Sequence, residues 1–480
     1  MNTGKNLFTL LLLVGLPLIF QAGLQAGQVQ RQPYNVVLIA VDDLNDWVGS
    51  MGGHPNAITP NIDRLVSQGT LFEHAYPAAP LCNPSRTAVF TGLRPSTSGI
   101  YCNHGWFRDK PELAEWVTLP QYFEQHGYAT YGGGKLFHHA KGKMSDPVSW
   151  QSYYQDRVGT PNPPEDQRYR HGLRGAFDDA SWYFNKALDW APRDIPKEET
   201  ADWQTADRAA KIINEKHDQP FFVGVGIFRP HLTWYATREF FDMHPLDGIE
   251  LPPHMENDLT DVPPVGRRLA RHDFPIIREA GKWKEGVRAY LACGSFADAC
   301  VGHVLQAVEG GPNKDNTVVV LWGDHGWNLG EKDHWAKYAL WEDTTRTPFV
   351  VYVPGNAPAR VGRAVSLVDI YRTLVDLCDL PEKGDIEGFS LVPFLEDPST
   401  ASRNPVVTTH WKDNHAVADG RYRYIHYRDG GEEFYDHAVD PNEWINRAND
   451  PGYAEVRKRL AGFIPAANAE HWDPESPDNM

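Results

Sequence analysis

The sequence predicts an α/β fold in which helices sandwich a mostly parallel central sheet, followed by a small antiparallel sheet with one helix. Three observations lead to this prediction. Continuous β-branched and apolar runs recur through most of the chain, as in strands that are buried on both faces. Helical patterns alternate with these runs, which is the order typical of a parallel sheet. Beyond residue 404, short alternating strands are separated by Gly-containing turns.

The individual elements follow from these patterns. The apolar runs predict central strands at 35–41, 129–131, 221–227, 317–322 and 348–353. Helical patterns cover 60–68, 119–125, 205–215, 287–308 and 367–378. The antiparallel strands are expected at 406–411, 416–418, 422–427 and 433–435, with the final helix at 454–463. Segments 146–174 and 245–273 are rich in Pro, Asp and Arg and are expected to be ordered surface excursions. We therefore expect a catalytic α/β domain at 33–400 and a C-terminal α+β subdomain at 401–480.

The N-terminus has the pattern of an export signal. Lys5 supplies a positive charge, residues 7–20 are apolar, and small residues follow up to Ala26. The apolar run is short for a membrane span, and no other run is long and apolar enough to be one. The sequence therefore predicts a signal peptide at 1–26 and a secreted or periplasmic protein with no membrane span.

Charge and cysteine content narrow the possible functions. A net charge of −17 argues against nucleic acid as a partner. If the substrate is an anion, a local cationic pocket that takes the end of a chain is favoured over a long basic groove. The five cysteines are an odd number, so at least one lacks an intramolecular partner. Cys293 and Cys300 lie about 10 Å apart along a predicted helix, too far for a disulfide, whereas Cys82 could pair with Cys102.

Two acidic pairs follow buried-strand candidates directly. Asp42 and Asp43 follow one strand, and Asp324 with His325 follows another. The carboxyl ends of parallel strands meet at one edge of a sheet, where ligands bind. Carboxylate oxygens in this number suit one Ca²⁺ or Mg²⁺ ion better than a softer metal. Solvated turns or helix caps are the alternative interpretation of such pairs.

The segment CNPSRTAVFTG, which begins at Cys82, places a thiol where a helix is expected to start. A thiol at a helix N-terminus is suited to chemistry, and Arg86 lies one turn further on. The segment matches C-x-P-S-R-x-x-x-x-[ST]-G and resembles the signature of the type I sulfatase family. The resemblance implies that a maturation enzyme oxidises Cys82 to formylglycine, whose hydrate attacks sulfate esters. It also implies an alkaline-phosphatase-like fold.

Further segments resemble the iduronate-2-sulfatase group of that family. They are Gly134-Lys135-Leu136-Phe137-His138, Arg229-Pro230-His231, the Asp324-His325 pair and the segment around Lys337. A P-loop is excluded, because no Ser or Thr follows Lys135. His139 and Lys332 are the neighbours that could take the place of His138 and Lys337.

The resemblance assigns a role to each residue. The residues expected to bind the metal are Asp42, Asp43, Asp324 and His325 together with residue 82. Arg86 clamps the nucleophile and the carboxylates. Lys135 and Lys337 bind the sulfate, His231 protonates the departing sugar oxygen, and His138 takes the proton of the formylglycine hydroxyl. The implied substrate is a sulfated carbohydrate, with 2-O-sulfated uronic acid favoured.

Three further residues are candidates for substrate contact by analogy: His104, Trp106 and Trp327. The two tryptophans could equally be packing residues, because the chain contains 16 of them. Two rival functions share these features. One is a phosphonate monoester or phosphodiester hydrolase, and the other is a sulfoglycan-binding protein without catalytic activity.

Overall fold

The computed structural model describes residues 33–154, 188–270, 273–401 and 405–472. The predicted signal peptide and the part of the 146–174 excursion beyond residue 154 lie outside the described residues. The described residues from Pro33 onward form one compact unit. The expected boundary at residue 400 therefore remains a prediction.

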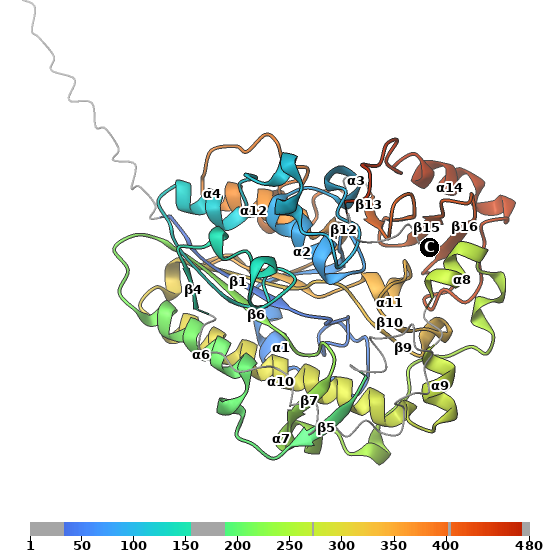
Figure 1. The fold of residues 1–480 in the computed structure, drawn as a ribbon, viewed down its shortest axis with the longest axis horizontal. Coiled ribbons are helices and arrows are strands. Elements are labelled where there is room, and N and C mark those ends of the chain that lie inside the picture. The colour runs from blue at the N-terminus through green and yellow to red at the C-terminus, as the bar shows by residue number, and fades with distance from the viewer. Residues whose placement is uncertain (1–32, 155–187, 271–272, 402–404, 473–480) are drawn as a thin grey trace, which may run out of the picture. The chain divides into compact units, whose positions relative to one another are not determined.

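A mixed, mostly parallel sheet runs through the described part of the chain (Figure 1). Its strand order is β12-β2-β11-β8-β1-β6-β3-β4. The pairs are parallel except those of β11, which runs antiparallel to β8 and β2. The strands are β1 (Asn35–Val41), β2 (Thr70–Tyr76), β3 (Ala129–Gly134), β4 (Ser152–Tyr153), β6 (Phe221–Ile227), β8 (Thr317–Gly323), β11 (Phe349–Tyr352) and β12 (Ala359–Ser366). All the predicted central strands are present, and β2, β4 and β12 are additional.

Helices cover both faces of this sheet (Figure 1). One face packs against α1 (Pro60–Val66), α6 (Ala201–Asn214) and α10 (Trp283–Gly310). The other packs against α2 (Cys82–Thr91), α4 (Leu119–Gln125), α12 (Asp369–Leu377) and α13 (Val392–Glu396). Strand β1 shows why its residues are apolar throughout: Val37 and Ile39 face one helical layer, and Val36 and Leu38 face the other.

Among the described residues, α10 alone has the length and apolar composition of a membrane-crossing helix. Most of its apolar window is buried inside the protein, where its side chains pack on the sheet. Its composition is accounted for by this core position.

The C-terminal antiparallel sheet has the order β13-β14-β15-β16, as expected. Its elements are β13 (Val406–Thr409), β14 (His415–Ala418), β15 (Tyr422–His426), β16 (Glu432–Asp436) and α14 (Ala454–Ala461). One face packs against α14 through Leu460. The other face buries Leu340 and Trp341, so this sheet covers the segment that follows Lys337.

Several shorter helices and strands lie between these elements. They are α3 (Pro95–Ser98), β5 (Trp190–Arg193), β7 (Trp234–Thr237), α7 (Arg238–Asp242), α8 (Pro264–Leu269), α9 (Asp273–Glu279), β9 (Asn328–Leu329), β10 (Trp335–Ala336) and α11 (Glu342–Thr345). The 245–273 segment is more than a surface excursion, because Val262, Val265 and Leu269 are buried against the C-terminal sheet.

Candidate active site

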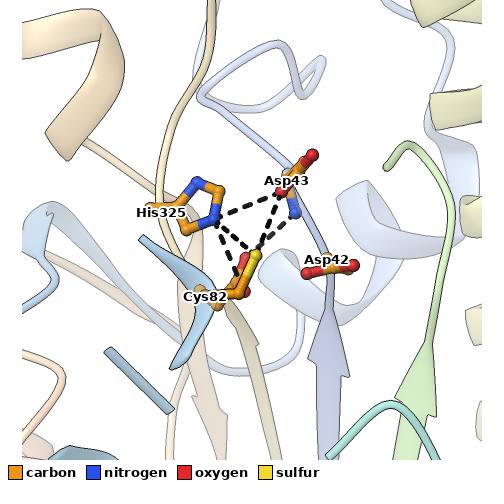
Figure 2. A group of neighbouring side chains, drawn as sticks. Asp42, Asp43, Cys82 and His325 are labelled. Carbon is orange, nitrogen blue, oxygen red and sulfur yellow. Dashed lines mark hydrogen bonds and ion pairs between the residues drawn. The ribbon is translucent and has the colours of Figure 1, made fainter. Parts of the chain in front are cut away.

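The candidate site lies at the carboxyl edge of the central sheet. Asp42 and Asp43 follow β1, and Asp324 and His325 follow β8, the strand beside it. Cys82 is the first residue of α2. These side chains offer ligand atoms that all lie within 4.8 Å of one another, and all five residues are buried. Figure 2 shows Cys82 beside His325 and Asp43, with Asp42 next to them on the end of β1.

The thiol of Cys82 is the centre of this group. Its Sγ lies 3.3 Å from His325 Nε2 and 3.7 Å from Asp43 Oδ1. Two ammonium groups also reach it, Lys337 Nζ at 2.9 Å and Lys135 Nζ at 3.6 Å. Residue 82 therefore lies beside side chains that can bind a metal ion and beside two ammonium groups. All five cysteines of the chain are free thiols, so the alternative of a Cys82–Cys102 disulfide is wrong.

Arg86 binds the two acidic pairs together. Its Nε donates to Asp324 Oδ2 at 2.7 Å and its Nη2 donates to Asp42 Oδ1 at 3.0 Å. Its Nη1 donates to the backbone carbonyls of Lys135 and Leu136. The guanidinium is fully buried and each of its three nitrogens donates to a fixed acceptor, which suits the fork geometry of arginine.

Burial and these cations set the charge of the carboxylates. Burial acts to raise the pKa of Asp42, but Lys135 and Arg86 outweigh it and hold that pKa well below its usual value. The pKa of Asp43 is also lowered, since His231 and Lys337 outweigh its burial. Burial raises the pKa of Asp324 despite Arg86.

The fit of this group to a metal ion rests on two observations. The donors are carboxylate oxygens with one imidazole and the residue-82 side chain, a set suited to a hard divalent cation. In addition, Asp43 Oδ2 is buried and has no hydrogen-bond partner among the described residues. An uncompensated buried carboxylate oxygen is costly, and a cation would satisfy it.

The two lysines are held by aspartates beside the thiol. Lys135 Nζ lies 2.5 Å from Asp42 Oδ2, and Lys337 Nζ lies 2.8 Å from Asp43 Oδ1. Lys135 follows Gly134, whose φ is +74° and where a Cβ atom would lie 1.9 Å from the carbonyl oxygen of Gly226. Glycine therefore permits the close approach of β3 and β6 that directs Lys135 to the site.

The sequence neighbours of these residues lie elsewhere. Lys332 is buried and donates to Asp258 and to the backbone of Glu443, away from the thiol. His139 is exposed, whereas His138 is half-buried. Burial and the charge of Lys135 lower the pKa of His138 well below its usual value, so this imidazole is neutral at neutral pH.

His231 reaches the site from the loop after β6. Its Nε2 lies 3.9 Å from Asp43 Oδ2, and its Nδ1 lies 2.6 Å from the Leu232 carbonyl oxygen. The His231 side chain is 15% exposed, so this imidazole lies at the accessible side of the buried cluster. Phe228 also lies at the site, and the sequence analysis did not identify it as a site residue. Lys135 Nζ lies 5.3 Å from the centroid of the Phe228 ring, and the ring centroids of Phe228 and His231 are 4.6 Å apart. The position of Phe228 directly before Arg229-Pro230-His231 was the available signal.

Two of the three candidate substrate contacts require a correction. Trp106 and Trp327 are 3% and 0% exposed and pack in the apolar core, so they take the packing interpretation. Trp327 also lies under Lys337, whose Nζ is 5.5 Å from the ring centroid. His104 is exposed. Its loop lies beside the nucleophile, because the N–H of Asn83 donates to Asn103 Oδ1 at 3.0 Å.

Comparison with known proteins agrees with this geometry. Residues 34–380 match the sulfatase family, and residues 330–469 match the C-terminal region of N-sulphoglucosamine sulphohydrolase. A sulfatase from Formosa agariphila is 39% identical over 97% of this chain and 93% of its own length. Mouse iduronate 2-sulfatase is 32% identical over 69% of this chain, and the match spans 61% of that relative. The solved phosphonate monoester hydrolase of Agrobacterium radiobacter has a TM-score of 0.69 and 20% identity, over 89% of this chain and 94% of that chain, and shares the fold.

A buried acidic cluster beside Cys82, at the carboxyl edge of a mostly parallel sheet, is suited to the hydrolysis of anionic esters. The chain belongs to the sulfatase family and is a sulfuric ester hydrolase. Cys82 fits the cysteine that formylglycine-type sulfatases modify, and the family implies a divalent metal at the carboxylate group.

Proposed function

We propose that this sulfatase removes sulfate from a sulfated saccharide, with 2-O-sulfated uronic acid residues as the favoured substrate. The observation that carries the sulfate-ester part is the pair of ammonium groups, Lys135 and Lys337, both directed at Cys82 Sγ. The preference for 2-O-sulfated uronic acid is supported by similarity to iduronate 2-sulfatase. The Asp324-His325 pair and the Lys135-to-His138 segment support it as well.

Each of the residues around Cys82 has a separate role in the proposed hydrolysis of the sulfate ester. Lys135 and Lys337 bind the sulfate oxygens and offset the charge that develops on them. His231, at the accessible side, donates a proton to the departing sugar oxygen. His138, neutral at neutral pH, accepts the proton released at residue 82 when sulfate departs. The formylglycine derived from Cys82 supplies, as its hydrate, an oxygen nucleophile that a plain thiol does not offer.

The metal is expected to be one Ca²⁺, with Mg²⁺ as the alternative. Asp42, Asp43, Asp324 and His325 would hold it together with residue 82. A bound divalent ion supplies positive charge that favours an anionic nucleophile and offsets sulfate charge. Arg86 keeps two of the carboxylates in place at 2.7 and 3.0 Å. Removing the metal with EDTA should abolish activity, and restoration by Ca²⁺ better than by Mg²⁺ would support this choice.

Maturation and export are part of the same proposal. A formylglycine-generating enzyme must act on Cys82, and the N-terminal 1–26 signal directs the chain out of the cytoplasm. Sequencing the N-terminus of protein recovered from the secreted or periplasmic fraction tests export. A mature N-terminus near residue 27 is the expected result.

A phosphonate monoester or phosphodiester hydrolase is the second candidate, because the fold is shared with such an enzyme. Desulfation of defined saccharides, assayed in parallel with phosphate monoesters and diesters, separates the two. We expect kcat/KM to be highest on 2-O-sulfated uronic acid at a chain end. A preference for phosphodiesters would overturn the proposal, and binding without turnover in fully converted protein would favour a sulfoglycan-binding protein. The Cys82→Ala variant is the control and should show no turnover.

A further inference from the structure

Lys337 lies in the segment 330–342, here called the lysine loop. The backbone of this loop has an uncommon conformation on both sides of Lys337. Positive φ values occur at Lys332 (55°), Asp333 (47°), Ala336 (117°) and Tyr338 (82°). Side chains with a Cβ atom rarely adopt such angles, which persist only where the surroundings hold the backbone in place. The position of Lys337 therefore depends on what binds the lysine loop from outside.

The C-terminal sheet binds one end of the loop through Arg423 of β15. This arginine is 1% exposed, and its Nη1 donates to the carbonyl oxygen of Leu340 at 2.9 Å. Its Nη2 donates to the Glu342 carboxylate, and its Nε lies 2.9 Å from Glu443 Oε1. Glu443 Oε2 in turn accepts the backbone N–H of Glu342 at 2.9 Å. One buried guanidinium thus joins the loop to two elements of the C-terminal region.

Further contacts hold the loop on both sides of Lys337. Lys332 Nζ donates to the backbone carbonyl of Glu443 at 2.6 Å, and Trp341 Nε1 donates to Glu433 Oε2 at 2.9 Å. Within the loop, His334 Nε2 lies 2.8 Å from the carbonyl oxygen of Lys337. The loop is therefore fixed at both ends by residues that follow position 420. In Figure 1, α11, which carries Glu342, lies close to the C-terminal strands.

Glu342, His437 and Glu443 also have the composition of a metal site, since their ligand atoms lie within 4.8 Å. The Arg423 guanidinium contacts both carboxylates and supplies the compensating positive charge. Burial acts to raise the pKa of Glu342, but Arg423 and His437 outweigh it and lower that pKa to about 2. This group is therefore an arginine-centred ion network.

We propose that Arg423 is a positioning residue for sulfate hydrolysis, because it holds the lysine loop so that Lys337 Nζ lies against residue 82. This inference rests on the proposed role of Lys337 in binding sulfate. Arg423 contacts none of the described residues around Cys82. It acts through its hydrogen bonds to Leu340 and Glu342. Displacing a sulfate-binding ammonium by about 1 Å can lower turnover by up to about a hundredfold.

The test is a double-mutant cycle on matured full-length enzyme with Arg423→Gln, Lys337→Met and the double variant. Arg423→Gln should lower kcat/KM about tenfold to a hundredfold and weaken inhibition by inorganic sulfate. In the Lys337→Met background it should cause no further loss, because the group that it positions is gone. Arg421→Gln is the matched control, since the Arg421 side chain is 55% exposed and pairs with Asp436 instead of contacting the lysine loop. This variant should leave activity within about twofold.

The outcomes separate the two proposals. Equal losses from Arg423→Gln with and without Lys337 would overturn the positioning role while leaving the role of Lys337 intact. Full activity of Lys337→Met would overturn both. If Arg423→Gln does not fold, Arg423→Lys preserves the buried charge but loses the fork geometry. That variant should show the same dependence on Lys337, and additive losses would contradict the positioning role.

Discussion

At the scale of single residues, Arg86 is the group on which the charge balance of the site depends. It lies between Asp42 and Asp324, and all three side chains are fully buried. Burial of charges is tolerated only where each is paired and hydrogen-bonded. Arg86 thus serves folding and catalysis through the same contacts.

Replacing Arg86 by Met should strongly reduce both the stability of the fold and the catalytic activity. Two buried carboxylates would lose their partner, which costs about 3–5 kcal/mol in the free energy of unfolding. Urea unfolding and turnover of the sulfate ester measure the two effects. The exposed pair of Arg238 and Asp194, whose side chains are 51% and 71% exposed, provides the comparison, because its loss should leave the free energy of unfolding almost unchanged. A stable Arg86→Met variant would contradict this account of the site.

The sequence was sufficient to predict which residues of a short motif lie together in the site. The fixed spacing in the segment from Cys82 to Arg86 places both residues on one helical turn, so their proximity follows locally. The tryptophans at 106 and 327 were different. Whether an indole faces substrate or core depends on side chains far away in the sequence, and the structure buries both.

At the scale of elements, α1 shows how a distant side chain completes a helix. Its N-cap residue, Thr59, makes no side-chain cap to the helix. Instead Asp298 of α10 accepts the backbone N–H groups of Asn61 at 3.0 Å and Ile62 at 2.7 Å. Asp298 thereby joins two helices of the same layer.

Replacing Asp298 by Ala should lower the free energy of unfolding by about 1–3 kcal/mol, because buried N–H donors lose their acceptor. Thermal or urea unfolding measures the change. Asp298→Asn keeps one acceptor oxygen and should be the milder variant. Equal stability of Asp298→Ala and the parent protein would refute the capping role.

The same residue predicts a pH dependence. Burial raises the pKa of Asp298 to about 6, from 3.8. The native state then binds this proton more tightly than the unfolded state, so its contribution to stability decreases as pH rises from about 4 to about 6. Unfolding of the parent protein and of Asp298→Asn across that range isolates the effect. The difference between their free energies should fall with rising pH, and a constant difference would contradict the assignment.

The strands missed from the sequence have a common physical reason. Only strands in the middle of the sheet are buried on both faces and read as continuous apolar runs. Strand β12 lies at the sheet edge and has exposed residues at several positions, and its partner β2 contains Glu73 and His74. Strand β2 pairs with β12 on one side and with β11 on the other, and both partners lie far away in the sequence, so no local pattern indicates where β2 sits in the sheet.

At the scale of the whole molecule, a site that contains three cationic side chains, Arg86, Lys135 and Lys337, is set in a chain of net charge −17. The field of such a chain repels polyanions at low ionic strength, and salt screens it over about 10 Å at 0.1 M. The resulting preference is for short substrates or chain ends.

This charge arrangement predicts an unusual salt effect. Raising ionic strength from about 0.01 M to about 0.15 M should increase kcat/KM for a long polysulfated saccharide several-fold. A monosulfated disaccharide should change much less and serves as the control. A steep decrease with salt would indicate a basic binding groove instead and would contradict this prediction.

The central claim is that residue 82 acts as a formylglycine and not as a thiol. The most direct test is the mass of the peptide carrying residue 82, taken from the same preparations whose sulfatase activity is measured. We expect active protein to show the mass of an aldehyde in place of the thiol, with activity proportional to the converted fraction. Full activity in protein whose residue 82 is an unmodified cysteine would contradict the claim.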